Sequence, residues 1–452
     1  MLNGKRSISR EELFDIFESA KKVFFVGIGG VSMSALAEYC VYLGKEVYGY
    51  DRERNEACKR LETVAKKIKY CSTPDSASHM DLVVYSNAID ESNFEIQCAI
   101  NEGLPLVSRS MLLGCIAKSF ETGIGVSGMH GKSTVTSMLS SIFQEAGKEP
   151  TVFCGAVMRD IGATYRLGDR KTVIFESCEY MDSFLDLSPT DALILNIDYD
   201  HPDYFKSMNQ IKKSFREFAD RSGRVFINAD NELCRSIFRG NEITFGINTP
   251  SEYTARNIFL GGVCEFDAYK NDKYLGRCLL NMAGIHSVYN ALAAFCVSYE
   301  NGICAEHIIK ALSCFKGSER RLELYKKRTQ GGDIYIDYAH HPKEISATLS
   351  AISLMGYKKI LCVFQAHTYS RTYYLYKEFT CCFGAADKVI ITDIYPAREE
   401  NIYGVSEEIL ARDVGGEYIS DLSVIANRIK TEDFDAAVIM GAGDITKIKK
   451  FL

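Results

Sequence analysis

Residues 125–134, with the sequence GVSGMHGKST, combine three glycines, one lysine and a pair of neighbouring hydroxyl side chains. Glycine lets a backbone approach a phosphate closely, Lys132 brings a positive charge to the terminal phosphates, and the hydroxyls suit Mg²⁺. The usual pattern of such loops places a further glycine where this chain has Val126. An expected strand before the stretch and an expected helix after it favour nucleotide binding over a plain glycine-rich turn.

Acidic side chains follow two apolar runs downstream of this loop. In IFESCE, Glu176 and Glu179 end an expected strand, and in LNIDYDH, Asp198, Asp200 and His201 end the next. The carboxyl ends of parallel strands border the crevice in which α/β proteins bind ligands, and carboxylates are preferred ligands of Mg²⁺. One such acid is usually a solvated strand end, but two clusters beside a lysine loop favour a metal–nucleotide site.

A second glycine-rich turn, GIGGVS at 27–32, lies between an expected strand and an expected helix, with Asp51 at the end of the following strand. Three interpretations stay open from these residues. A nicotinamide or flavin site is weakened by Ser32, which replaces the third glycine of G-x-G-x-x-G, and by the lack of hydride-transfer residues nearby. A structural tight turn and a site for another diphosphate, such as a nucleotide sugar, fit equally well.

Histidine is scarce in this chain. Six of the eight histidines follow apolar runs or begin a helix: His130, His201, His286, His340, His341 and His367. Each alone is best interpreted as structural, but their recurrence at junctions in three segments suggests one shared site. Arg320, Arg321 and Arg371 are suited to capture carboxylate or phosphate. Zinc is a weaker interpretation, because no histidine pair has i, i+4 spacing and no C-x-x-C pair occurs.

Alternating strands and helices must position these residues. Short β-branched and aromatic runs alternate with amphipathic patterns, which indicates parallel sheets with helices on their faces. The exception is 253–282, whose alternation and turn dipeptides at 261–262 and 271–272 predict antiparallel ribbons. The predicted fold is α/β with three domains: a Rossmann-like domain at 1–118, a central P-loop ATPase-like domain with the ribbon at 119–316, and a Rossmann-like domain at 317–452.

Composition excludes several function classes. The 452 residues are 46% hydrophobic and 25% charged, with a net charge of −6, which is a globular composition. Basic residues are interspersed with acidic ones, so we expect no nucleic-acid groove, and no apolar run is long enough for membrane insertion. The sixteen cysteines are spread through apolar segments, which predicts reduced thiols and a cytoplasmic location. The sequence leaves a monomer and a homodimer open.

The set of motifs resembles the Mur ligases, ATP-dependent enzymes that build the peptide of bacterial peptidoglycan. The matching stretches occur in order over nearly the whole chain: VGIGGVSMSALAE, GVSGMHGKST, FESCEYMDSFLDLSP, LNIDYDHPDYF, GIHSVYNALAA, FKGSERRLE, DYAHHPKEI, FQAHTYSRT, DIYPARE and GAGDI. The N-terminal glycine turn and the stretches DYAHHP and AHTYSRT resemble the alanine-adding members of the family more than its other members.

The resemblance implies ATP and Mg²⁺ as cofactors and assigns residues to them. ATP would contact Gly128, Met129, His130, Gly131, Lys132, Ser133, Thr134, His286, Asn290, Arg321 and Asp337. Within this set, Asn290 would read adenine and Arg321 would contact the transferring phosphate. The metal ligands would be Ser133, Thr134, Glu176 and His201. The catalytic residues would be Lys132, Glu176, His201 and Arg321.

The resemblance also implies the substrate contacts. Gly29, Gly30 and Ser86 would hold the UDP moiety, which makes the first glycine turn a nucleotide-sugar site. The acyl and amino-acid substrates would lie near Tyr338, His340, His367 and Arg371.

Four positions depart from the family pattern. Met129 replaces a threonine in the phosphate loop, which removes a hydroxyl but no backbone N–H, and Ser32 stands where glycine is common. Ser287 occupies the place of the first asparagine of H-N-x-x-N and puts one nucleotide contact in doubt. Ala366 replaces a usual proline.

The implied activity is ligation of L-alanine to the lactyl carboxylate of UDP-N-acetylmuramate through an acyl phosphate. Two alternatives are a ligase that recycles a tripeptide onto the same UDP-sugar and a non-catalytic nucleotide or UDP-sugar sensor. Retention of Lys132, Glu176, His201 and Arg371 counts against the sensor. A dehydrogenase is the least favoured interpretation.

Overall fold

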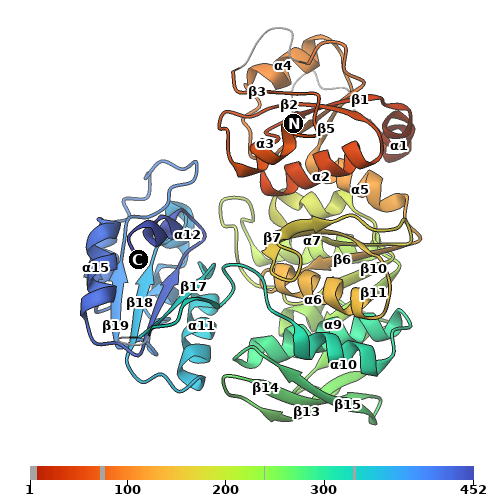
Figure 1. The fold of residues 1–452 in the computed structure, drawn as a ribbon. Coiled ribbons are helices and arrows are strands. Elements are labelled where there is room, and N and C mark those ends of the chain that lie inside the picture. The colour runs from red at the N-terminus through yellow and green to blue at the C-terminus, as the bar shows by residue number, and fades with distance from the viewer. Residues whose placement is uncertain (1–7, 72–76, 239, 329–331) are drawn as a thin grey trace. The chain divides into compact units, whose positions relative to one another are not determined.

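The computed structural model describes residues 8–71, 77–238, 240–328 and 332–452, in which helices flank three β-sheets (Figure 1). Contacts group the chain into two compact units. Unit 1 comprises Met1–Ser127, Glu149–Leu193 and Ser214–Val225. Unit 2 comprises Gly128–Lys148, Ile194–Lys213 and Phe226–Leu452.

A five-stranded parallel sheet forms the N-terminal part of unit 1, in the order β3-β2-β1-β4-β5. Its strands are β1 (Lys22–Val26), β2 (Glu46–Tyr50), β3 (Lys67–Lys69), β4 (Leu82–Tyr85) and β5 (Leu106–Ser108). The central strand β1 is buried along almost its whole length, as the apolar run KVFFV requires of a strand covered on both faces. The strand order reverses between β1 and β4, and α/β sheets bind ligands at such a reversal.

The helices of this part begin at polar caps. They are α1 (Arg10–Ser19), α2 (Val31–Tyr42), α3 (Glu56–Leu61), α4 (Phe94–Asn101) and α5 (Arg109–Lys118). The side chains of Ser9, Asn55, Asn93 and Ser108 accept backbone N–H groups at the first turn of α1, α3, α4 and α5. In contrast, α2 begins at Gly30 without a side-chain cap, which leaves its first N–H groups for other partners.

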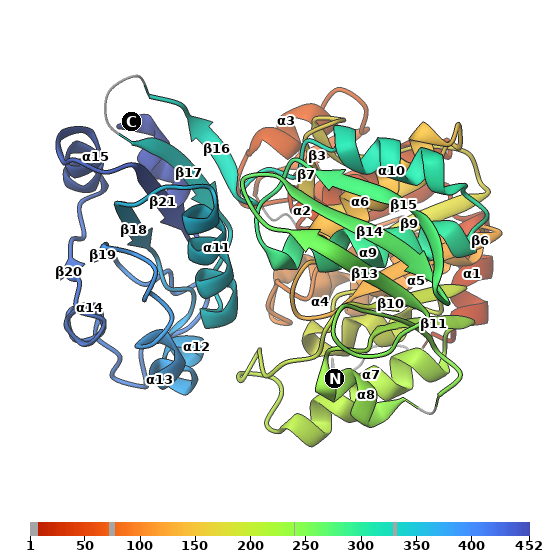
Figure 2. The same ribbon diagram turned by 90° about the horizontal axis from the view of Figure 1, so that it is seen from below.

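The second sheet has ten strands in the order β15-β14-β13-β12-β11-β10-β6-β9-β7-β8. They are β6 (Thr122–Ser127), β7 (Thr151–Met158), β8 (Ala163–Arg166), β9 (Thr172–Glu176), β10 (Asp191–Ile194), β11 (Arg224–Asn228), β12 (Ile243–Gly246), β13 (Tyr253–Phe259), β14 (Cys264–Lys270) and β15 (Lys273–Leu280). β13, β14 and β15 form the predicted antiparallel ribbon (Figure 2). Asn271 and Asp272 turn the chain between β14 and β15 with φ of 45° and 64°, the left-handed values of a two-residue hairpin.

The helices that accompany this sheet are η1 (Tyr180–Asp186), α6 (Lys132–Glu145), α7 (Met208–Asp220), α8 (Glu232–Ile237), α9 (Ile285–Glu300) and α10 (Ala305–Cys314). Within unit 2, α10 packs on β15, on α6 and on α9. α9 is buried along most of its length, from Ser287 to Ser298, because it lies between α6 and the ribbon. The start of α9 is thereby held close to the start of α6.

A six-stranded sheet with the order β16-β17-β21-β18-β19-β20 forms the C-terminal part of unit 2. Its strands are β16 (Glu323–Lys326), β17 (Asp333–Asp337), β18 (Ile360–Phe364), β19 (Lys388–Ile391), β20 (Glu417–Tyr418) and β21 (Ala436–Met440), and all pairs except β16 with β17 are parallel. The helices are α11 (Pro342–Leu354), α12 (Tyr369–Tyr374), α13 (Tyr376–Phe379), α14 (Glu407–Asp413), α15 (Leu422–Thr431) and η2 (Ile445–Lys450).

Alternate strand residues of this sheet pack on opposite faces. Cys362 and Phe364 belong to a core that includes residues of α11, α13 and α14, whereas Leu361 and Val363 pack against α15 and η2. The period of two along an apolar strand therefore builds two cores, one on each face.

The predicted α/β class is confirmed, with a Rossmann-like part at each end of the chain and a central part that carries the ribbon. The domain boundaries near 118 and 316 stay predictions. The cysteines carry no disulfide bond in the described ranges. Among the same residues, no helix has the length and apolar character that crossing a bilayer requires.

Candidate functional site

The phosphate loop joins β6 to α6. Gly131 is the N-cap of α6 with φ of 89°, a left-handed value, and Gly128 has φ of 130°. A Cβ at 131 would lie 2.7 Å from Asn290 Oδ1, and a Cβ at 128 would lie 3.1 Å from the backbone of Asn196. Glycine is therefore required at both positions, by backbone conformation and by space.

Asn196, two residues beyond β10, fixes the shape of the loop. Its Oδ1 accepts the His130 N–H at 2.9 Å, and its Nδ2 donates to the His130 carbonyl at 2.9 Å. The Met129 N–H donates to the Asn196 carbonyl at 3.3 Å. The sequence-based prediction missed Asn196. The sequence feature that could have indicated Asn196 is its position as a polar residue between Leu195 and Ile197, just before Asp198 and Asp200.

The polar side chains at the start of α6 lie close to the loop backbone. Lys132 Nζ donates to the Gly128 carbonyl at 2.5 Å and to the Met129 carbonyl at 3.3 Å, so its ammonium lies against the loop. Ser133 and Thr134 are buried in the first turn of the helix. The Met129 side chain is also buried, and its replacement of threonine leaves the loop backbone held by Asn196.

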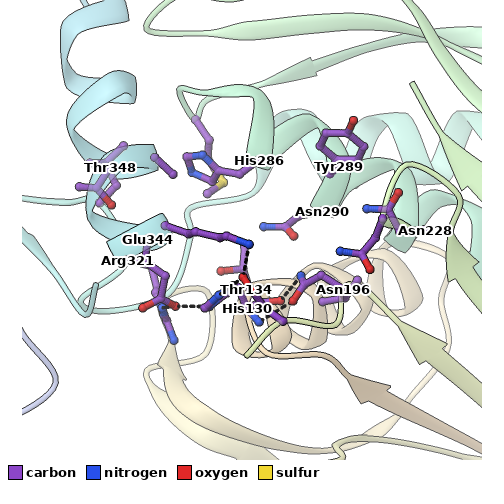
Figure 3. Close-up of a pocket in the computed structure, with 18 of the residues that line it drawn as sticks. His130, Thr134, Asn196, Asn228, His286, Tyr289, Asn290, Arg321, Glu344 and Thr348 are labelled. Atoms are coloured by element: carbon purple, nitrogen blue, oxygen red, sulfur yellow. Dashed lines mark hydrogen bonds and ion pairs between the residues drawn. The ribbon is translucent and has the colours of Figure 1, made fainter. Parts of the chain in front are cut away.

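A cavity of about 310 Å³ lies beside this loop in unit 2 (Figure 3). Its polar wall includes four asparagines, from β11, from the segments that follow β10 and β11, and from α9: Asn196, Asn228, Asn231 and Asn290. Its apolar wall includes Leu195, Phe245, Met282, Leu322 and Ala347. Apolar walls with a few converging polar groups are typical of a small-molecule site.

Glu344 connects α11 to the phosphate loop. It is the third residue of α11, and its Oε2 accepts the N–H groups of His340 at 3.1 Å and His341 at 3.3 Å. Its Oε1 lies 3.0 Å from His130 Nδ1 and 3.8 Å from Arg321. Burial opposes its ionisation, but the neighbouring His130 and Arg321 outweigh burial and hold the pKa of Glu344 well below its usual range.

The pKa of His130 is shifted in the opposite direction to that of Glu344. Burial lowers the pKa of His130, but Glu344, Asp200 and Asp198 outweigh burial and raise it above the usual value. The shifts of the two pKa values in opposite directions show that Glu344 and His130 stabilise each other's charged form, which couples α11 to the loop.

Arg371, on α12, and Asp200 form a buried ion pair. Arg371 Nε donates to Asp200 Oδ1 at 2.9 Å, and both side chains are at most 5% exposed, so their charges have almost no water to screen them. Burial disfavours the Asp200 carboxylate, but the Arg371 guanidinium outweighs burial and holds its pKa well below the usual range. Arg371 also contacts His367, through Nδ1 at 3.2 Å and the backbone carbonyl at 3.3 Å.

Three other predicted histidines are held uncharged. Burial lowers the pKa of His286 to about 4, of His340 to about 3 and of His367 to about 4. The ring centroids of His340 and His367 are 5.8 Å apart, and that of Tyr338 is 5.3 Å from His340. These side chains therefore act at neutral pH as hydrogen-bonding groups rather than as cations.

Asp337, the last residue of β17, is hydrogen-bonded to the backbone next to Arg321. Its Oδ2 accepts the Leu322 N–H at 2.5 Å and its Oδ1 accepts the Ala339 N–H at 2.7 Å. Burial raises its pKa. The guanidinium carbons of Arg320 and Arg321 lie 4.8 and 4.9 Å from the centre of the Tyr338 ring. Of this group, Arg321 and Asp337 line the cavity.

Of the four predicted metal ligands, Glu176 lies at the end of β9 and His201 lies in the segment that follows β10. Glu176 ends β9, paired in register with Val126 of β6, and its carboxylate accepts the Gly155 N–H. His201 has φ of 54°, and its N–H donates to Asp200 Oδ1 at 2.7 Å. His201 therefore lies beside the Arg371–Asp200 pair.

The first glycine turn stands at the strand-order reversal of unit 1. Gly29 and Gly30 follow β1, and Ser86 follows its neighbour β4. A Cβ at Gly29 would come within 2.6 to 2.9 Å of three side chains, one of them Asp51. Asp51 accepts the Gly29 N–H at 2.8 Å and the Glu53 N–H at 3.1 Å. Both carboxylate oxygens of Asp51 thus accept backbone N–H groups. In a dinucleotide site the corresponding acid binds a ribose hydroxyl, so these contacts weaken the dinucleotide interpretation.

The structure brings together the phosphate loop, Asn290, His286, Arg321 and Asp337 in unit 2. It gathers Tyr338, His340, His367 and Arg371 around Asp200 and the loops that follow β17 and β18. Two departures from the family pattern have local explanations. The Ser287 hydroxyl donates to the Ala283 carbonyl at 2.8 Å, and Ala366 is part of a buried core.

Three Mur ligase models match consecutive parts of the chain. The Mur ligase family catalytic domain matches residues 22–121, the Mur ligase middle domain residues 126–298, and the glutamate ligase domain residues 320–443. Together they extend over the three sheets described above.

Full-length relatives agree with these matches. The chain is 40% identical to the UDP-N-acetylmuramate–L-alanine ligase of Caldanaerobacter subterraneus subsp. tengcongensis and 41% identical to that of Clostridium kluyveri, covering in each case 96% of this chain and 98% of the relative. The crystal structure of UDP-N-acetylmuramate-alanine ligase from Thermotoga maritima is similar, with a TM-score of 0.82 and 26% identity over 95% of this chain and 98% of that one. From its sequence matches and its fold, the chain belongs to the Mur ligase family.

Proposed function

We propose that this chain joins L-alanine to the lactyl carboxylate of UDP-N-acetylmuramate, with cleavage of ATP to ADP and phosphate, in peptidoglycan precursor synthesis. The proposal is carried by the cavity of unit 2, to which the phosphate loop, α9, Arg321 and α11 contribute. The relatives that match nearly the full length carry this reaction in their names.

ATP, as a substrate, occupies the cavity in this proposal. The N–H groups at the start of α6, from Gly131 to Thr134, and the ammonium of Lys132 bind its phosphates. The apolar wall with Phe245 and Met282 covers the base, while Asn290 and the uncharged His286 offer hydrogen bonds to its edge.

The side chains assigned to Mg²⁺ fit that ion in their donor chemistry. Ser133 and Thr134 offer hydroxyl oxygens in the first turn of α6, and Glu176 offers a carboxylate. Oxygen donors are the preferred ligands of Mg²⁺, and His201 adds an imidazole. When bound, Mg²⁺ would neutralise negative charge on the phosphate oxygens.

Lys132 and Arg321 assist the activation of the substrate's lactyl carboxylate. A carboxylate is a poor electrophile, so the γ-phosphoryl group of ATP is transferred to it first, giving an acyl phosphate and ADP. Lys132 and Arg321 spread the negative charge of the phosphoryl group during this transfer. Arg321 is oriented by Glu344 on one side and by Tyr338 on the other.

The amine attack takes place beside Arg371 and the uncharged histidines. Neutral L-alanine attacks the acyl carbon, and phosphate leaves with one former carboxylate oxygen. Arg371, held by Asp200, faces His367 and suits a carboxylate group of a substrate. His340 and His367 do not repel the amine because their pKa values of about 3 and 4 leave them uncharged.

The UDP-sugar is bound in unit 1, where the N-terminus of α2 and the turn at Ser86 border the strand-order reversal. The first N–H groups of α2 have no side-chain cap and suit a diphosphate.

Phosphate release in the presence of ATP, Mg²⁺ and UDP-N-acetylmuramate, with a panel of amines, tests this function. L-alanine should give the highest kcat/KM, with serine and glycine lower. A preference for the tripeptide L-alanyl-γ-D-glutamyl-diaminopimelate would instead assign the chain to muropeptide recycling. Calorimetric binding of ATP and UDP-sugar without turnover with any amine would leave it a sensor.

A further inference from the structure

His130, Asp198 and His341 offer one ligand atom each, and these three atoms lie within 4.8 Å of one another. The three residues come from the phosphate loop, from the segment after β10 and from the N-cap of α11, far apart in sequence. They are separate from the residues assigned above to Mg²⁺. We propose that His130, Asp198 and His341 form a binding site for a late first-row divalent cation, with Zn²⁺ as its natural ligand.

The orientation of His130 supports the proposal most directly. Its Nδ1 lies 3.0 Å from Glu344 Oε1, so the carboxylate fixes the ring. Its Nε2 is shielded from solvent and has no hydrogen-bond partner among the residues that the structure describes. Metal-bound histidines ordinarily use one ring nitrogen for the metal and give the other to a carboxylate or carbonyl. Nε2 of His130 is thus positioned as a ligand atom.

The other two residues face this nitrogen. Asp198 Oδ1 accepts the Tyr199 N–H at 2.9 Å, whereas Oδ2 lies 3.9 Å from His130 Nε2. The ring centroids of His130 and His341 are 4.9 Å apart. His341 Nε2 lies 3.4 Å from the Tyr199 carbonyl, and its Nδ1 lies 3.3 Å from the Lys343 backbone nitrogen. Coordination through Nε2 therefore requires the tautomer with its proton on Nδ1, in place of the Lys343 N–H contact.

The surroundings favour a cation at this point. Although burial lowers the pKa of His130, the carboxylates of Glu344, Asp200 and Asp198 raise it overall, so the field at the ring is negative. Lys343 Nζ lies 2.5 Å from Asp198 Oδ2 and supplies positive charge there. Its side chain is 69% exposed, so it can turn into solvent when a metal ion takes its place.

The donor set selects the metal. Two imidazoles and one carboxylate match Zn²⁺, whose sites with three protein ligands keep a fourth position open, here toward the cavity. Mg²⁺ prefers all-oxygen ligands. Ligand atoms around a tetrahedral Zn²⁺ are about 3.4 Å apart, so the side chains must close by roughly 1 Å. Late first-row ions also bind nitrogen ligands more tightly than Mn²⁺ or Fe²⁺.

The test uses the full chain without nucleotide or Mg²⁺, titrated with Co²⁺, whose visible absorption is intense in four-coordinate sites. The wild type should bind one Co²⁺ with such a spectrum, and Zn²⁺ should displace it. His130→Gln and His341→Asn should each weaken binding at least tenfold, and Glu344→Gln about tenfold, because it orients His130. His307→Gln is the matched control, since His307 also lies near a carboxylate, Glu145 at 3.9 Å, but is half exposed.

A second variant separates coordination from misfolding. In His341→Cys, the difference spectrum against the wild type should contain a new sulfur-to-cobalt charge-transfer band, because the thiolate replaces an imidazole ligand. The difference spectrum cancels contributions from the exposed cysteines already present. Equal Co²⁺ binding by the wild type and His130→Gln, or the absence of that band from His341→Cys, would overturn the proposal. Neither readout depends on ligase activity, so a failed ligase assay leaves this test intact.

Discussion

At the scale of single residues, Lys132 holds its ammonium 2.5 Å from the Gly128 carbonyl, at the start of α6. Lys132→Ala removes the charge that stabilises the transferring phosphoryl group, and we expect kcat for phosphate release to fall at least about 100-fold. UDP-sugar binding should persist, because the turn at Gly29 and Gly30 belongs to unit 1. Phosphate release and calorimetry with UDP-N-acetylmuramate measure the two effects.

The control for this variant is Lys148→Ala. Lys148 is an exposed lysine of unit 2 that donates to the Asn301 carbonyl at 3.3 Å, away from the loop. Its removal should leave turnover unchanged. Near-normal phosphate release by Lys132→Ala would contradict the assignment of the loop.

The phosphate loop could be predicted from sequence because its chemistry is local, within ten consecutive residues. Asn196 and Glu344 could not be predicted as its partners, because their contacts with His130 join positions 66 and 214 residues apart. Asp200 was recognised as a site residue, but its position after a strand suggested a metal role. In the structure Asp200 pairs with Arg371.

At the scale of elements, Glu344 has two functions in α11. It accepts the N–H groups at the helix start and contacts His130 and Arg321. Glu344→Gln keeps an oxygen for the helix cap but removes the negative charge that orients His130 and Arg321. We expect kcat/KM to fall about 100-fold, equivalent to about 2.7 kcal/mol, with little change in Tm.

Glu408→Gln is the matched variant, since Glu408 is a glutamate in the first turn of α14. It should retain full activity and the same Tm. If Glu344→Gln turned over at the wild-type rate, the contact between α11 and the phosphate loop would have no catalytic role.

Asp230 links the turn after β12 to α9. Its carboxylate accepts the N–H groups of Ile247, Asn248 and Thr249 and the hydroxyl of Tyr289, which lines the cavity. Burial opposes ionisation, but these hydrogen bonds outweigh it and lower the pKa of Asp230 to about 2.

A folded-state pKa below the unfolded value adds stability that is complete above about pH 4 and is lost as the pH falls toward 2. After allowance for solvent screening, the contribution is on the order of 1 kcal/mol. Urea unfolding of the wild type and Asp230→Asn should therefore show a stability difference at pH 6 that decreases at pH 3. If the difference were the same at both pH values, ionisation of Asp230 would not be the source of the stability.

Some strands could be predicted from the sequence and others could not. The ribbon β13–β15 was predicted because its alternation and its Asn271-Asp272 turn are both encoded locally. The hairpin of β7 and β8 was not predicted, because a register irregularity separates its pairs between Phe153 and Met158 and hides the alternation. β20 is only two residues long and lies at the edge of its sheet, where it pairs with one strand.

At the scale of the whole molecule, folding of unit 2 buries the Arg371–Asp200 ion pair, whose two residues lie far apart in the sequence. Arg371→Met would leave the Asp200 carboxylate buried without a partner, and we expect a loss of about 3 to 5 kcal/mol in unfolding free energy. Adding Asp200→Asn should recover a large part of that loss, because the remaining amide carries no charge. Urea denaturation of the single and double variants measures both effects.

An exposed pair provides the comparison. Arg428→Met removes the contact with Glu417 at the surface and should cost about 0 to 1 kcal/mol. Equal losses for Arg371→Met and Arg428→Met would show that burial does not govern the Asp200 pair.

The proposed reaction depends on activation of the sugar-linked carboxylate by ATP at the unit 2 cavity. The most direct measurement uses UDP-N-acetylmuramate with ¹⁸O in its lactyl carboxylate, together with ATP, Mg²⁺ and L-alanine, and determines the isotope content of the released phosphate by mass spectrometry. An acyl phosphate predicts that each phosphate carries one ¹⁸O from the carboxylate, and that Lys132→Ala yields almost no labelled phosphate. Amide formation with unlabelled phosphate would contradict this mechanism.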